Sequence, residues 1–162
     1  SKNRNRSATP ATRWLDQHRI PYSVHHYDYA HQGGARQAAA ELETDLHHVA
    51  KTLVMEDEHG NPLVIIMHGD LEVSTRELAR QTGAKKIVPC APAMAERHTG
   101  YKVGGTSPFG TRKRMPLWVE ADLLELEKIF INGGRRGLLL GIAPAVLVDP
   151  LGAQPVQVGR PA

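Results

Sequence analysis

The sequence predicts one folded domain in which helices pack outside a mixed β-sheet. Some β-rich runs come in adjacent pairs and others are separated by helical segments, a pattern that favours a mixed sheet over a regular alternation of strand and crossover helix. The length of 162 residues suits one domain with one sizeable core. Hydrophobic residues make up 41% of the chain, which argues against disorder over most of its length.

The expected N-terminal elements are a tail, a helix and a strand. Residues 1–12 are polar, basic and contain a proline, so we expect a flexible tail there and a single domain over residues 13–162. Helical spacing begins near Trp14 and ends before Pro21. The alternation from Tyr22 to Tyr29 then predicts a strand.

The middle of the chain predicts helices around a hairpin. The stretch "ARQAAAELE" is rich in strong helix formers, and a second short helix is expected from Asp45. In "KTLVMEDEHGNPLVIIMH" two apolar runs flank a cluster of turn-forming residues, which is the clearest hairpin signal. Ser74 is placed to cap the helix "STRELARQTG", and Gly83 follows its expected end. A short strand, "KKIVPC", and a helix, "APAMAERHTG", come next.

The C-terminal part predicts the remaining strands. "PLWVEADLLELEKIFI" indicates a strand, a short connecting turn or helix, and a second strand. The glycines of "NGG" turn the chain into the apolar run "RRGLLLGI". A last short helix is expected over "APAVLVDPLG" and a last strand over "AQPVQV".

Composition excludes several classes of protein. Cys90 is the only cysteine, so an intrachain disulfide and a zinc site of four cysteines are excluded. No apolar run approaches the roughly 20 residues that span a bilayer, and the N-terminal stretch lacks the apolar core of a signal peptide. We therefore expect a cytoplasmic protein with no membrane partner. The net charge of +3 is compatible with an RNA or nucleotide partner but does not identify one.

Nine histidines and one cysteine raise the question of a reactive centre. Zinc needs three or four converging ligands, and neighbours on a strand point to opposite faces, so His25 and His26 are not expected to share a metal. We expect no metal and no cofactor. Cys90 lies between two prolines with no basic neighbour to lower its pKa, which favours a structural thiol over a nucleophile.

Two features could bind an anion. "GYKVGGTSPFGTRKRMP", from Gly100 to Pro116, contains paired glycines that let backbone groups approach a ligand, followed by the basic residues Arg112, Lys113 and Arg114. A glycine bulge with a solvated basic turn is an equally good interpretation of that stretch. Lys51 stands directly before "TLVM", where its ammonium could reach a cleft. Spacing alone favours a lysine that snorkels from a strand end.

Taken together, five stretches resemble the YbaK family, free-standing aminoacyl-tRNA editing proteins related to the insertion domain of bacterial prolyl-tRNA synthetases. The stretches are "LDQHRIPYSVHHYD", "HHVAKTLVM", "ELARQTGAKKI", "TGYKVGGTSPFGTRKRMP" and "IFINGGRRG". The resemblance runs from about Trp14 to Gly159. It implies a single-domain α+β fold with a mixed, barrel-like sheet, and hydrolysis of the ester between a wrong amino acid and tRNA, with cysteine on tRNA(Pro) as the best-known case.

The resemblance also implies roles for individual residues. Lys51 matches the essential lysine of the family, and Gly104 and Pro108 match its G-x-x-x-P loop. Tyr27 matches a tyrosine that borders the pocket. The residues implied to contact substrate around these positions are Gly105, Thr106, Ser107, Asn132 and Gly133, and those expected to contact tRNA are Arg112, Lys113 and Arg114.

Two positions depart from the family pattern. Family members often read "YVSGGKRG" where this chain reads "FINGGRRG", so Asn132 replaces a pocket serine. Leu139 falls where a polar or acidic residue can occur. Asn132 is larger than serine and offers a donor and an acceptor, so we expect a changed preference among cysteine, alanine, serine and threonine. The alternative is that Asn132 supports the tight turn.

The implied chemistry needs no strong protein nucleophile, because the ester is already activated and positioning can supply much of the rate. The attacking group could be water, the ribose hydroxyl or the thiol of a bound cysteine. Mischarged tRNA is the expected partner, and prolyl-tRNA synthetase is a second one. Two other functions stay open: a non-catalytic module that binds tRNA or nucleotide, and a protein that acts by binding a synthetase.

Overall fold

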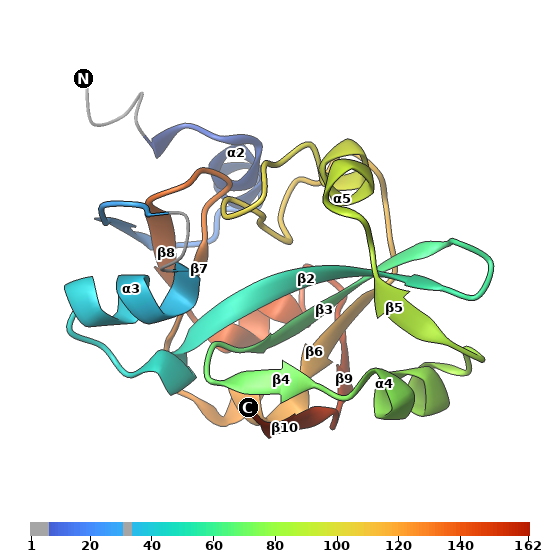
Figure 1. Ribbon diagram of the computed structural model, residues 1–162. Helices are drawn as coiled ribbons and strands as arrows, with labels where there is room; N and C mark the ends of the chain where they lie inside the picture. Colours follow the sequence, from blue (N-terminus) through green and yellow to red (C-terminus); the bar gives the residue numbers. More distant parts are fainter. Residues whose placement is uncertain (1–6, 31–33) are drawn as a thin grey trace.

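The structure, a computed structural model, describes residues 7–30 and 34–162. It shows an α+β fold with a mixed sheet, as the sequence predicts (Figure 1). The α-helices are α2 (Pro10–Gln17), α3 (Gly34–Glu41), α4 (Thr75–Thr82) and α5 (Pro92–Thr99). Three 3₁₀ helices are η1 (Leu46–His48), η2 (Ala121–Glu125) and η3 (Pro144–Leu147). In the described part of the chain, no helix is long and apolar enough to cross a membrane.

The strands form one large sheet and one small one. Eight belong to the large sheet, in the order β1-β8-β7-β2-β3-β6-β9 with β5 joined to β2, and two form the ladder β10-β4. β2 pairs with β7 in parallel and with β3 and β5 antiparallel, so the sheet is mixed. The strands are β1 (Ser23–His26), β2 (Val49–Asp57), β3 (Pro62–His68), β4 (Leu71–Val73), β5 (Ile87–Pro89), β6 (Leu117–Glu120), β7 (Ile129–Asn132), β8 (Leu138–Ile142), β9 (Gln154–Val156) and β10 (Gly159–Pro161).

The β2–β3 hairpin lies between two hydrophobic cores. Alternate residues of a strand point to opposite faces. Val64 and Ile66 of β3 therefore join the larger cluster, while Ile65 and Met67 join a second cluster with Leu78 of α4. Because both faces of β3 are covered, all seven of its residues are buried. This hairpin is the rigid base from which the candidate site is built.

Local signals explain the best-predicted helices. The Ser74 side chain accepts a hydrogen bond from the Glu77 N–H at 3.2 Å and caps α4, while Gly83 ends it with a left-handed φ of 84°. Gly100 ends α5 in the same way, with a φ of 80°. The predicted hairpin is also present, as β2 and β3.

The N-terminal helix begins earlier than the sequence pattern indicates. α2 starts at Pro10, and Ala11 and Thr12 are buried, so the expected tail does not reach residue 12. Thr9 caps the helix by accepting from the Thr12 N–H, and the Thr12 hydroxyl accepts from the Thr9 N–H in return. This capping box has a threonine, Thr12, at the position where glutamate or glutamine is usual, so the usual sequence signature of a capping box is absent. Residues 1–6 of the expected tail lie outside the described residues.

Candidate functional site

A cleft of about 470 Å³ opens beside β2 where the strand changes neighbours. On the outer edge of β2, β7 pairs with Val49 and Ala50, and β5 pairs with residues 55–57. Between these two ladders, residues 51–54 line the cleft. The gap therefore presents strand backbone as well as side chains to a ligand, on a rigid support.

Lys51 lines this cleft, and its essential role in catalysis stays a prediction. Its side chain is half-buried, and desolvation lowers the pKa of the ammonium below its ordinary value of 10.5, while the carboxylates of Glu72 and Asp70 act in the opposite direction. A positive charge that is only partly hydrated interacts more strongly with an anion than a fully solvated one. Lys51 is thus suited to hold a phosphate or to stabilise an oxyanion.

Gly104 lines the same cleft at the tip of a tight turn. The Gly105 N–H donates to the Lys102 carbonyl at 2.8 Å, and Gly104 has a φ of 87°, which is the third position of a type II turn. A Cβ atom added at Gly104 would lie 2.5 Å from the Tyr29 hydroxyl. Glycine is therefore required here both by the backbone angle and by the close approach of Tyr29.

Asn132 joins the glycine turn to the β7–β8 turn. Its Oδ1 accepts from the Gly134 N–H at 2.7 Å and the Arg135 N–H at 3.2 Å, and its Nδ2 donates to the Gly104 carbonyl at 3.1 Å. Arg136 adds a second link, because its Nε donates to the Val103 carbonyl at 2.8 Å. Asn132 both lines the cleft and supports its wall.

The structure divides the predicted substrate-contacting residues into two groups. Tyr27 and Thr106 line the cleft together with Lys51, Gly104 and Asn132. The others lie behind that surface or away from it. A Cβ at Gly105 would meet the Arg136 backbone nitrogen at 2.9 Å, and one at Gly133 would meet the Leu138 side chain at 2.9 Å.

Ser107 and Pro108 also stand outside the cleft lining. Ser107 is fully buried, and its hydroxyl accepts from the Phe109 N–H at 3.3 Å. Pro108 lines a different cavity. These positions, with Gly105 and Gly133, allow close packing of the two turns, and their direct contact with substrate stays a prediction.

The cleft includes Thr52, whose role the sequence pattern does not reveal. The backbone hydrogen-bonding groups of successive β2 residues point alternately to the two edges of the strand. The Val49 carbonyl accepts from the Gly69 N–H on the β3 side, and the Val54 carbonyl accepts from the Cys90 N–H on the other side. Thr52 therefore directs its N–H and C=O toward the cleft edge. Its Oγ1 is buried without a hydrogen-bond partner in the protein. Only the change of neighbours along β2 identifies Thr52, and that is a property of the sheet.

Cys90 also borders the cleft. Burial, together with the charge of Glu56, raises the pKa of the thiol above 9.0. The thiol form is a poor nucleophile, so the structure supports the sequence-based interpretation of Cys90 as structural.

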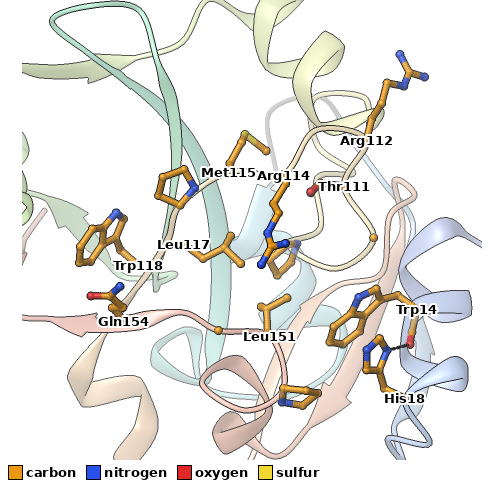
Figure 2. Close-up of a pocket in the computed structure, with 15 residues that line it drawn as sticks. Trp14, His18, Thr111, Arg112, Arg114, Met115, Leu117, Trp118, Leu151 and Gln154 are labelled. Atoms are coloured by element: carbon orange, nitrogen blue, oxygen red, sulfur yellow. Dashed lines mark hydrogen bonds between the residues drawn. The ribbon is translucent and has the colours of Figure 1, made fainter.

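The three basic residues predicted to contact tRNA are all exposed. Arg112 and Arg114 line a larger cavity of about 850 Å³ between α2 and β6 (Figure 2). In Figure 2, Arg114 lies among the lining residues, near Leu117 and Leu151, whereas Arg112 extends away from them. The larger cavity lacks Lys51 and the glycine turn, so the smaller cleft is the better candidate for chemistry despite its volume. Contact of Arg112, Lys113 and Arg114 with tRNA stays a prediction.

Known proteins are similar to this chain in sequence and in fold. The candidate Cys-tRNA(Pro)/Cys-tRNA(Cys) deacylase EbsC of Enterococcus faecalis is 27% identical over 150 residues, which is 92% of both chains. A proline–tRNA ligase of Brachyspira hyodysenteriae is 21% identical over 85 residues, covering 52% of this chain and 15% of the ligase. A crystal structure of a candidate trans-editing enzyme for prolyl-tRNA synthetase matches with a TM-score of 0.81 at 22% identity, over 94% of this chain and 98% of that one.

The match to a protein family covers most of the chain and most of the cleft. Residues 31–149 match the aminoacyl-tRNA editing domain, and this range includes Lys51, the Gly104 turn and Asn132. Tyr27 lies just before it. The protein therefore belongs to the aminoacyl-tRNA editing domain family.

Proposed function

We propose that this protein is a trans-acting deacylase that hydrolyses the ester of mischarged tRNA. The preferred substrate is cysteine on tRNA(Pro) or another small amino acid, namely alanine, serine or threonine, on tRNA. The observation that carries the proposal is that Lys51 and the Gly104 turn line one cleft on a rigid sheet edge. Its volume of about 470 Å³ is within the range of small-ligand pockets and suits a terminal adenosine bearing a small amino acid.

The groups around the cleft support a mechanism by positioning and charge. Lys51 would hold the terminal phosphate or the neighbouring ribose and stabilise the oxyanion that forms as the carbonyl is attacked. The Gly104 turn would approach the adenosine and the carbonyl with backbone alone. Thr52 would offer a polar group of the substrate the backbone N–H and C=O that it directs toward the cleft edge.

The attacking group comes from the substrate or from solvent in this mechanism. Water adds to the ester carbonyl, or the thiol of a bound cysteine displaces the ribose oxygen to give a thiolactone that water then opens. In both routes the ribose oxygen leaves with a proton. Attack by the free ribose hydroxyl only moves the acyl group to that oxygen, from which water must still release it. The raised pKa of the Cys90 thiol argues against a covalent intermediate on the protein.

The lining also supports a preference for small amino acids. Leu139 and Ala38 give the cleft an apolar wall, and both are almost fully buried. Two of the hydrogen-bonding groups of Asn132 are already used within the protein. A small and weakly polar side chain, such as that of cysteine or alanine, fits such a wall best.

A deacylation panel tests the proposed function. One tRNA(Pro) is charged in turn with cysteine, alanine, serine, threonine and the cognate proline, and release of each amino acid is measured with and without the protein. We expect at least one small non-cognate amino acid to be released much faster than proline. Binding of every charged tRNA without release would instead support the non-catalytic module.

The requirement for a synthetase is tested in the same assay. Prolyl-tRNA synthetase is added to the reaction, and its binding to the protein is measured separately by co-purification. We expect hydrolysis without the synthetase. Hydrolysis only in its presence would support the function as a synthetase-binding protein.

A further inference from the structure

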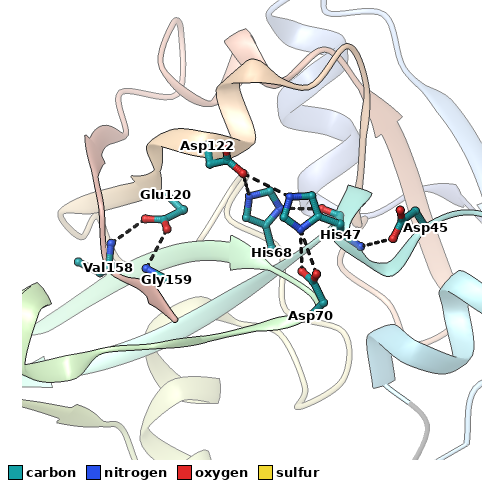
Figure 3. Close-up of polar contacts among 8 residues, drawn as sticks. All are labelled: Asp45, His47, His68, Asp70, Glu120, Asp122, Val158 and Gly159. Carbon is teal, nitrogen blue, oxygen red and sulfur yellow. Dashed lines mark hydrogen bonds and ion pairs between the residues drawn. The ribbon is translucent and has the colours of Figure 1, made fainter. Parts of the chain in front are cut away.

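Four side chains outside the cleft converge at one end of the β2–β3 hairpin (Figure 3). His47 belongs to η1, His68 ends β3, Asp70 follows β3, and Asp122 lies in η2. The two imidazole rings are stacked, with centroids 3.7 Å apart. The ligand atoms of His47, His68 and Asp70 lie within 4.8 Å of one another. None of these residues lines the cleft proposed for deacylation.

Hydrogen bonds fix the Nδ1 proton of both histidines. His47 Nδ1 lies 2.9 and 3.0 Å from the two carboxylate oxygens of Asp70, and His68 Nδ1 lies 2.6 Å from the His47 carbonyl. A carboxylate and a carbonyl can only accept, so each Nδ1 must carry the proton. In the neutral rings, each Nε2 then holds a free lone pair, which is the tautomer that binds a metal through Nε2.

Both Nε2 atoms approach the same carboxylate oxygen. Asp122 Oδ2 lies 3.3 Å from His47 Nε2 and 3.0 Å from His68 Nε2. His68 is fully buried, and although its Nε2 is close to Asp122, it has no hydrogen bond of acceptable direction. His47 Nε2 is within hydrogen-bonding distance of Asp122, so the unsatisfied atom is the buried His68 Nε2, and a cation bound between the three atoms would give it a partner.

The distances from Asp122 Oδ2 to the two imidazole nitrogens match those between ligands of one metal ion. Zinc binds imidazole nitrogen and carboxylate oxygen at about 2.0–2.2 Å in tetrahedral sites, which separates neighbouring ligand atoms by about 3.3 Å. The separations from Asp122 Oδ2 are 3.3 and 3.0 Å. Asp70 and the His47 carbonyl then occupy the usual places behind zinc-bound histidines, where a carboxylate or backbone carbonyl accepts from the other ring nitrogen.

We propose that His47 Nε2, His68 Nε2 and Asp122 Oδ2 bind one divalent transition-metal ion of the zinc class. Three protein ligands leave a fourth position for water. The Asp122 side chain is 61% exposed, which gives the ion a route from solvent. The stacked rings hold their in-plane lone pairs nearly parallel, so binding one ion requires the His47 ring to tilt about χ2 while His68 stays in place. The partly exposed Asp70 side chain must move with His47 to keep its hydrogen bond. The ion would tie η1, β3 and η2 together.

Metal titration of the 162-residue protein tests this site. Protein freed of metal with a chelator is titrated with Zn²⁺ by calorimetry and with Co²⁺ by visible absorption. We expect one ion per chain and a rise in the melting temperature with Zn²⁺. Asp122→Ala and His47→Ala should each weaken binding at least a hundredfold, and Asp70→Asn should weaken it by about ten- to a hundredfold through the orientation of His47.

A surface histidine provides the matched control. The side chain of His59 is 74% exposed in the β2–β3 turn, so His59→Ala should bind Zn²⁺ as the wild type does. Circular dichroism confirms folding of each variant, and the exposed Asp122 makes Asp122→Ala decisive if His47→Ala does not fold. The proposal is overturned if the wild type binds no Zn²⁺ at micromolar concentration. It is equally overturned if folded Asp122→Ala binds as tightly as the wild type.

Discussion

Glycine is required at position 104 for two separate reasons. Its φ of 87° is strained for any side chain, and a Cβ would also collide with the ring of Tyr29. We predict that Gly104→Ala reduces deacylation at least tenfold and lowers the free energy of unfolding by about 1–3 kcal/mol. Deacylation rates and thermal melts measure the two effects.

Gly83→Ala separates the effect of backbone strain from that of a collision with Tyr29. Gly83 has nearly the same φ, 84°, but a Cβ there meets nothing within 4 Å. Gly83→Ala should therefore destabilise the protein through strain alone and leave the deacylation rate of the folded protein unchanged. If Gly104→Ala has full activity and wild-type stability, the glycine turn is not a wall of the site.

Asn132 is explained by its hydrogen bonds better than by its size. Its side chain joins Gly104, Gly134 and Arg135, and serine is too short to make all three bonds. We predict that Asn132→Ser lowers the melting temperature and slows release of every small amino acid by a similar factor. The assay compares cysteinyl and seryl release from one tRNA. A large change in their ratio without loss of stability would show that Asn132 selects the amino acid.

Sequence information at the residue scale is uneven for a physical reason. Lys51, Gly104, Tyr27 and Asn132 could be identified because they stand in stretches that resemble a family. Thr52 could not be identified, because its importance comes from its place in the gap on β2 between the residues that pair with β7 and those that pair with β5. Residue type and spacing do not encode such a change of neighbours.

At the scale of elements, the Glu120 side chain stabilises the start of the C-terminal strand, β10. Its buried carboxylate accepts from the N–H groups of Val158 at 2.7 Å and Gly159 at 2.8 Å, just where β10 joins β4 (Figure 3). We predict that Glu120→Gln lowers the free energy of unfolding by about 1–3 kcal/mol, because an amide has one acceptor oxygen for two donors. Chemical denaturation measures the loss.

Glu72 on β4 is the control for this prediction. It is exposed and lies 3.9 Å from Arg160, a weak surface ion pair, so Glu72→Gln should change stability by less than about 0.5 kcal/mol. Equal effects of the two substitutions would mean that Glu120 does not anchor β10.

The elements themselves follow the sequence where local signals are strong. Helix α4 has a capping serine and a terminal glycine, and the β2–β3 hairpin has a turn cluster between apolar runs. β4 and β10 have three residues each and are defined by pairing with one another, so no local pattern announces them. The start of α2 also depends on a contact that is distant in sequence, because the hydroxyl of its cap, Thr9, donates to the Gly133 carbonyl.

At the scale of the whole molecule, the basic turn gives the molecule a charged face beside its larger cavity. Arg112, Lys113 and Arg114 are exposed on one loop of a chain whose net charge is +3. We predict that replacing all three with alanine raises the Michaelis constant for charged tRNA and reduces the slope of log affinity against log salt by about 2. Deacylation assayed over a range of salt concentrations measures both.

A second triple variant controls for net charge. Arg76, Lys85 and Lys86 are also exposed, lie near α4 and do not border either large cavity. Replacing them with alanine removes the same charge but should leave the salt slope nearly unchanged. If both triple variants behave alike, tRNA responds to overall charge and not to the basic turn.

The proposed function depends above all on the action of Lys51 on the ester of mischarged tRNA, and the rate of deacylation by Lys51→Ala shows whether Lys51 has that role. Each protein is assayed at the same molar excess over one mischarged tRNA. Lys86→Ala is the exposed-lysine control, and circular dichroism verifies that the variants fold. Loss of a charge-stabilising group predicts a fall on the order of a hundredfold or more for Lys51→Ala and none for Lys86→Ala. A folded Lys51→Ala protein that releases the amino acid at the wild-type rate would show that Lys51 does not act on the ester.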